Sequence, residues 1–133
     1  MEKDLAINNC FVCGPDNPIG LHLNIEDGDG WAKVSWTIGE NYVGYANIVH
    51  GGIMVTILDD LMAHATYSMN VDIMTVHLEI DYKAPAYVGE TIDCEAHIEH
   101  YGGRKSIQMA GTIKRGDTLI AEVKGIVVII GKK

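Results

Sequence analysis

A histidine, two glycines and a later aspartate stand close together in this sequence and could form parts of a catalytic site. The stretch 47–65 reads NIVHGGIMVTILDDLMAHA, in which His50, Gly51 and Gly52 precede an apolar run that contains Asp59. Free backbone N–H groups at a helix start, together with the positive end of the helix dipole, can stabilise an oxyanion. A carboxylate kept in an apolar helix can act as a general base or a nucleophile.

The apolar run predicts a buried helix that begins near Ile53, with Asp59 some two turns along it. That places Asp59 about 10–12 Å from the glycines, too far to attack a group that they hold. The same residue of a second copy of the chain could come within reach, so we expect the site to form across a dimer. Asp60 shares its face with Thr56 and His64, a polar edge. Two structural explanations stay open, namely that the glycines serve packing and that Asp59 is a buried acid paired with His64 or a partner chain.

Length, composition and charge limit the classes of protein that this chain can belong to. The 133 residues suffice for one domain, which we expect to span 1–133, and hydrophobic residues make up 47%. The net charge of −8 disfavours nucleic-acid binding, which needs basic residues to neutralise phosphates. No apolar stretch approaches the roughly 20 residues of a membrane span, and MEKDLAINNC lacks the apolar core of a signal peptide. We therefore expect a cytoplasmic protein that binds neither nucleic acid nor membranes.

Three cysteines raise the question of a metal or redox site. Cys10 and Cys13 form one CxxC pair, and Cys94 stands alone. A structural zinc site needs four ligands, and this pair could recruit only Cys94 and a histidine such as His22. A redox pair would stand at a helix start after a strand, whereas this one precedes a Pro/Gly/Asn loop. We expect the pair to anchor the N-terminal loop, with no metal and no cofactor.

Apolar alternation predicts an α+β fold with one long helix and about six antiparallel strands. In the strand that contains Thr75, the alternation places that residue opposite the apolar face formed by Val76, Leu78, Ile80 and Tyr82. A strongly twisted sheet wrapped around the single helix would bury one side of it, and a second copy of the chain would cover the remaining stripe. The predicted strands are residues 21–25, 31–38, 75–85, 91–100, 106–114 and 119–131, and the helix ends near residue 68 or 70.

These residues resemble the hotdog-fold acyl-CoA thioesterases, in particular the branch with the phenylacetic-acid-pathway enzyme and the human mitochondrial members. The resemblance rests on HGG followed by an aspartate nine residues after the histidine, and on the opening segment CFVCGPDNPIGLHL. It covers nearly the whole chain. It implies a hotdog fold, hydrolysis of acyl-CoA thioesters to free acid and CoA, and a homodimer or a dimer of dimers (a homotetramer).

The resemblance also implies roles for individual residues. The backbone N–H of Gly51, with Gly52 close by, would polarise the thioester carbonyl, and His50 would shape the start of the helix. Asp59 of the partner subunit would activate water or attack directly, and Thr75 would orient the water. Such activity should rise with pH through the acid range, because the base must be ionised.

The substrate-binding residues follow less directly from the sequence. Some members carry an asparagine six residues before the histidine, where this chain has a glycine, and Asn47 is the alternative. Tyr45 and Met62 are expected to line the acyl pocket, and Arg104 and Lys105 to contact the CoA phosphates. Two other functions stay open, a hydratase or dehydratase on the same fold and a non-catalytic acyl-CoA-binding protein.

Overall fold

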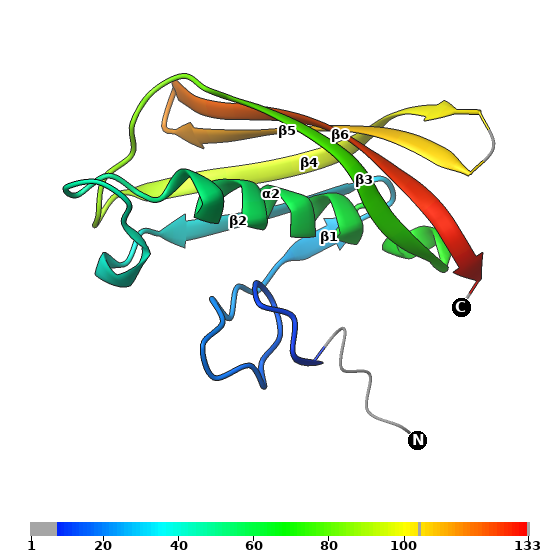
Figure 1. Ribbon diagram of the computed structural model, residues 1–133, viewed down its shortest axis with the longest axis horizontal. Coiled ribbons are helices and arrows are strands. Elements are labelled where there is room, and N and C mark those ends of the chain that lie inside the picture. The colour runs from blue at the N-terminus through cyan, green and yellow to red at the C-terminus, as the bar shows by residue number, and fades with distance from the viewer. Residues whose placement is uncertain (1–7, 104, 133) are drawn as a thin grey trace.

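The computed structural model describes residues 8–103 and 105–132 and shows one helix lying against a six-stranded sheet (Figure 1). The sheet is antiparallel throughout, with the strand order β1-β2-β4-β5-β6-β3. Along the chain the elements are β1 (Glu26–Gly28), β2 (Trp31–Thr37), the 3-10 turn η1 (Glu40–Tyr42), α2 (Gly51–His64), the 3-10 turn η2 (Tyr67–Met69), β3 (Val71–Tyr82), β4 (Thr91–Gly102), β5 (Ser106–Arg115) and β6 (Thr118–Lys132). The predicted fold class is confirmed.

The core forms where the apolar side of α2 meets the concave face of the sheet. The buried helix residues Met54, Ile57, Leu58 and Leu61 recur at helical spacing. On β5, and on β4 as far as Ala96, every second residue is buried, as two-residue alternation requires. Each buried Leu or Ile stabilises the fold by about 1.5–3 kcal/mol relative to an exposed one, so this interface fixes where α2 lies. None of the described helices is long and apolar enough to cross a membrane.

The first predicted strand, at residues 21–25, is wrong. The backbone N–H groups of Leu21 and Leu23 donate to the carbonyls of Phe11 and Val12, each at 2.8 Å, instead of to a neighbouring strand. His22 between them has a φ of 54°, which interrupts extended backbone. The short strand β1 instead occupies Glu26–Gly28, between the strands predicted at 21–25 and 31–38.

A β-bulge in β3 changes which side chains face the helix. The pairing with β6 shifts between Thr75 and His77, so Val76 is an extra residue in the strand. Thr75 consequently points at α2, where its hydroxyl donates to a helix carboxylate. The prediction that Thr75 lies opposite the helix-facing side was wrong, because strict alternation does not survive a bulge.

Candidate active site

The helix start is built by His50, which precedes the first residue of α2. Its Nδ1 accepts a hydrogen bond from Gly52 N–H at 2.9 Å, and its carbonyl accepts from Ile53 N–H at 3.0 Å. In the described residues no hydrogen bond engages Gly51 N–H. Of the two predicted donors, Gly52 is thus occupied by His50, while Gly51 keeps the free N–H group that an oxyanion could accept from.

Two aromatic rings explain why both residues after His50 are glycines. Tyr82 donates from its hydroxyl to the Gly51 carbonyl at 2.8 Å. A Cβ atom on Gly51 would lie 3.0 Å from that hydroxyl oxygen, and one on Gly52 would lie 3.0 Å from the His50 ring. Glycine therefore permits close approach at both positions, and the packing explanation holds alongside the functional one. The contact of Tyr82 with the helix start was not predicted.

A hollow of about 510 Å³ opens beside the helix start. Its lining combines apolar residues such as Ile48, Met54 and Pro85 with His50 and one cation, Lys83. The Lys83 ammonium also lies 3.6 Å from the Glu122 carboxylate, so its charge is partly balanced.

Three predicted binding residues lie outside this hollow. Met62 is completely buried in the core and does not line this hollow, so its predicted contact with the acyl group stays a prediction. Tyr45 is 82% exposed, and Asn47 is exposed with its carbonyl accepting from Val88 N–H at 2.9 Å. Neither contributes to the hollow of a single chain.

The predicted phosphate contacts lie at the other end of the molecule. Lys105 is in the turn between β4 and β5, which Figure 1 places opposite the start of α2. Arg104 lies outside the described residues. Lys105 therefore does not line the hollow of its own chain, and its contact with the CoA phosphates stays a prediction.

Asp59 meets β3 through a single short contact. The Thr75 hydroxyl donates to Asp59 Oδ1 at 2.7 Å, and both residues are half-buried. This bond satisfies one carboxylate oxygen and fixes the direction of the group. Thr75 was predicted to orient a water, and the structure places it on the carboxylate itself. Asp59 and Gly51 of one chain remain about 12 Å apart along the helix axis.

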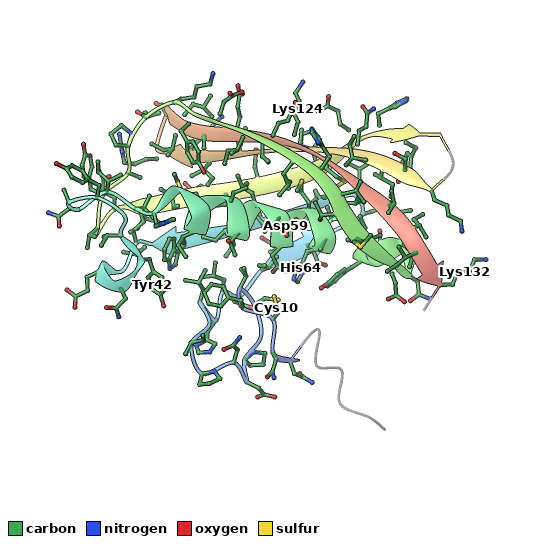
Figure 2. All side chains as sticks on the ribbon, in the orientation of Figure 1. Cys10, Tyr42, Asp59, His64, Lys124 and Lys132 are labelled. Atoms are coloured by element: carbon green, nitrogen blue, oxygen red, sulfur yellow. The ribbon has the colours of Figure 1, made fainter. Side chains whose placement is uncertain are left out.

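Asp60 points toward the N-terminal loop, since its carboxylate contacts Cys10. Figure 2 shows Cys10 of this loop on the side of α2 where His64 lies. Cys10 Sγ lies 3.3 Å from Asp60 Oδ1, and His64 Nε2 lies 3.4 Å from Asp60 Oδ2. The predicted polar edge of Asp60 and His64 is confirmed, and His64 pairs with Asp60 rather than Asp59. The sequence did not predict that Cys10 and Cys13 reach this edge.

The buried groups of this edge have shifted pKa values. Burial lowers the pKa of His64, but hydrogen bonds with Asp60 and Asp27 outweigh it, so the net shift is upward. Burial raises the pKa of the Cys13 thiol, and the neighbouring Cys10 and Asp60 raise it further. The Cys13 thiol therefore stays protonated at neutral pH as long as no cation is bound beside it.

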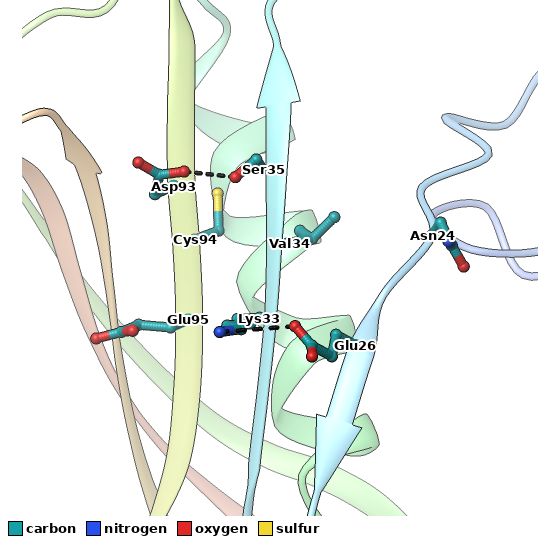
Figure 3. Close-up of a pocket in the computed structure, with 8 residues that line it drawn as sticks. All are labelled: Asn24, Glu26, Lys33, Val34, Ser35, Asp93, Cys94 and Glu95. Carbon is teal, nitrogen blue, oxygen red and sulfur yellow. Dashed lines mark hydrogen bonds and ion pairs between the residues drawn. The ribbon is translucent and has the colours of Figure 1, made fainter.

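A second hollow, of about 370 Å³, lies along β1, β2 and β4 (Figure 3). Its lining carries three carboxylates, Glu26, Asp93 and Glu95, and one ammonium, Lys33, which lies 3.6 Å from Glu26. Ser35 donates to Asp93 at 2.5 Å. None of the predicted site residues lines it. The hollow at the helix start is therefore the better candidate for substrate binding.

Comparison with known families identifies the class. Residues 46–122 match the thioesterase superfamily, and the chain belongs to that family. An Archaeoglobus fulgidus protein described as "Putative esterase" is 29% identical over 103 residues, which cover 77% of this chain and 67% of that protein. The Escherichia coli acyl-coenzyme A thioesterase PaaI is 22% identical over 97 residues, covering 73% of this chain and 69% of PaaI.

Solved structures agree on the fold. The E. coli PaaI structure superposes with a TM-score of 0.78 at 23% identity, covering 85% of this chain and 83% of that one. A "Hypothetical Thioesterase Protein" of Streptococcus pneumoniae, solved with coenzyme A, gives a TM-score of 0.77 at 18% identity, covering 84% and 88%. The chain is a hotdog-fold thioester hydrolase, as the resemblance implied.

Proposed function

We propose that the protein hydrolyses acyl-CoA thioesters and that Asp59 and Gly51 of different subunits form each active site. The observation that carries this proposal is the Asp59–Thr75 bond of 2.7 Å on the half-buried side of α2. A carboxylate with one oxygen held by a hydroxyl keeps its second oxygen in a fixed direction for a water or a carbonyl carbon. Gly51 N–H supplies the oxyanion donor.

The reaction needs both parts at once. As a base, Asp59 takes a proton from a water molecule, and the oxygen of that water attacks the carbonyl carbon of the thioester. Gly51 N–H donates to the oxyanion that forms, and the C–S bond then breaks to release CoA and the acid. As a nucleophile, Asp59 attacks the same carbon directly and displaces CoA as the thiolate, and water then hydrolyses the resulting anhydride to the acid and free Asp59.

The edge of β3 supports a dimer. In the described chain β3 pairs with β6 along one edge only, and Met74, Val76, Leu78 and Tyr82 are apolar yet exposed. Unpaired strand edges with apolar side chains favour association with another strand. A partner chain that pairs with β3 would lie next to Thr75 and Asp59. The start of the partner's α2 would then lie close to the Asp59 carboxylate.

For the CoA end, Lys83 is the preferred phosphate contact. It lines the hollow beside Gly51, whereas Lys105 of the same chain lies at the far end. The S. pneumoniae protein was solved with coenzyme A, which supports a CoA thioester as the substrate class.

Two further structures of that S. pneumoniae protein support the assignment of Asp59 and Thr75. One carries an aspartate-to-alanine change and the other a threonine-to-alanine change, at positions sixteen residues apart, the separation of Asp59 and Thr75 here.

The test is release of free CoA from a panel of short, medium and aromatic acyl-CoAs. The native protein should hydrolyse at least one of them, and Asp59→Asn should lower kcat by about 100-fold or more while binding the same substrate. A folded native protein that binds the panel without hydrolysing it would overturn the proposal in favour of acyl-CoA binding.

A further inference from the structure

The segment before β1 brings two cysteines onto the side of α2 that faces away from Asp59. Cys13 N–H donates to Cys10 Sγ at 3.5 Å, and Gly14 N–H donates to the Cys10 carbonyl at 2.9 Å. A Cβ at position 14 would lie 2.4 Å from Cys10 N, so this turn requires Gly14. The tight turn holds both sulfur atoms on one side, with an N–H group directed at one of them.

The helix presents two further ligand types to the same place. Asp60 and His64 are one helical turn apart, and their side chains approach each other at 3.4 Å. Cys10 Sγ lies 3.3 Å from Asp60 Oδ1, and Cys13 Sγ lies 3.4 Å from His64 Nε2. The ligand atoms of Cys10, Cys13 and Asp60 all lie within 4.8 Å of one another.

One atom in this cluster is unexplained by hydrogen bonding. Asp60 Oδ2 is buried and accepts no hydrogen bond from the described residues, and the Asp60 side chain is only 14% exposed. A buried carboxylate oxygen without a donor is costly, and two groups can supply the missing positive charge here: a protonated His64, whose Nε2 lies 3.4 Å away, or a cation held between Asp60 and the thiols.

We propose that Cys10 Sγ, Cys13 Sγ, the Asp60 carboxylate and His64 Nε2 bind one zinc ion. Zinc bonds of about 2.0–2.3 Å in a tetrahedron separate neighbouring ligand atoms by about 3.4–3.8 Å. Three contacts of 3.3, 3.4 and 3.4 Å approach these edge lengths, two of them to different oxygens of Asp60. Cys10, Cys13 and Asp60 form the preassembled part of the site, and His64 joins them by a shift of its ring toward Cys10. Binding releases the two thiol protons to solvent and leaves two thiolates, a carboxylate and a neutral imidazole around the cation.

A second contact of His64, with Asp27, supports the assignment of a metal site. Asp27 Oδ2 lies 2.9 Å from His64 Nδ1, so in the neutral imidazole a proton on Nδ1 is held by this carboxylate and Nε2 can bind the metal. Carboxylate–histidine–zinc triads of this kind are the usual outer layer of zinc sites.

Four protein ligands close the coordination sphere, so the zinc has a structural role and leaves no position for substrate. The zinc links the loop of residues 8–25 to α2. It also stabilises the helix turn that carries Asp59 and Asp60. Cys94 and His22, the further ligands considered from the sequence, are not part of this cluster, and the expectation of no metal is replaced by this proposal. This inference is independent of the proposed hydrolysis.

The test is the zinc content of the full chain, expressed with zinc chloride in the medium and purified without chelator. We expect about one zinc per chain, a fall of about tenfold or more in Cys10→Ser and in Asp60→Asn, and no change in Cys94→Ala. Cobalt added to the zinc-free protein should give thiolate-to-cobalt charge-transfer absorption in the native chain and in Cys94→Ala.

Three results would overturn the proposal. One is a folded native chain that holds less than about a tenth of an equivalent of zinc and shows no cobalt absorption. Another is zinc content that Cys10→Ser and Asp60→Asn leave unchanged. The third is a Cys10–Cys13 disulfide, seen by mass spectrometry as the loss of two hydrogens, in protein isolated under reducing conditions.

Discussion

Asp59 and Asp60 are neighbours in the chain, yet they serve two different regions of the molecule. Asp59 points to β3, bonds to one hydroxyl and stays half-buried near an open strand edge. Asp60 points to the N-terminal loop and lies among two thiols and an imidazole. Consecutive helix residues are turned by about 100°, so one helix can present a carboxylate for chemistry and another for structure. Adjacent identical residues therefore need separate functional arguments.

The largest effect should come from mixing two inactive variants, which tests whether the Asp59 side faces a partner. Asp59→Asn removes the carboxylate, and Gly51→Val blocks the helix start. After unfolding and refolding together at equal amounts, about half of the dimers are mixed and each holds one intact site, so about a quarter of native activity should return. The measurement is CoA release against each variant refolded alone. Activity no greater than the sum of the two variants refolded alone would mean that Asp59 and Gly51 of the same subunit form one site.

Removing the metal tests the Asp60 side. A chelator should lower the thermal midpoint of the native protein by about 5–10 °C, equivalent to about 2 kcal/mol of unfolding free energy, because the loop loses its attachment to α2. Differential scanning calorimetry measures this, with Cys10→Ser as the matched control, since it lacks the site and should not respond to chelator. An equal shift in both proteins would contradict a metal effect.

Thr75→Val keeps the shape of the side chain and removes the bond to Asp59. We expect kcat to fall by about tenfold, because a hydrogen bond to a charged group contributes about 1.5–3 kcal/mol and other donors replace part of it. Thr75→Ser keeps a hydroxyl and should retain most of the activity. Steady-state kinetics of both variants separates the two effects. Similar rates for the two variants would show that the hydroxyl has no role.

The smallest effect sharpens the comparison between the two acids. Asp59→Asn should change the thermal midpoint by no more than about 2 °C and leave the zinc content at the native level, because the amide oxygen can still accept from Thr75. Elemental analysis and calorimetry on the same sample decide this. Loss of zinc in Asp59→Asn would mean that the two regions are coupled and that the contrast between them fails.

Much of the fold follows from local patterns in the sequence. The alternating segments from residue 31 onward and the apolar run after His50 predicted five of the strands and the helix, because burial on one face imposes a period of two or about 3.6. The segment 21–25 also alternates, but its backbone groups bond to the cysteine loop. Alternation shows which side chains could be buried, and it does not show which backbone groups pair.

The sequence by itself determined the class of fold, a helix start close to His50 and the presence of a carboxylate in an apolar helix, although the helix ends at His64 rather than near residue 68 or 70. Only the tertiary structure decided the partners of each acid. A single extra residue in β3 turned Thr75 toward Asp59, and a loop fifty residues upstream brought Cys10 to Asp60. Helical and strand periods are local, whereas a bulge and a loop contact depend on residues far apart in the chain. For that reason the spacing of apolar residues predicted the helix and the strands, whereas tertiary packing determined which side chains contact one another.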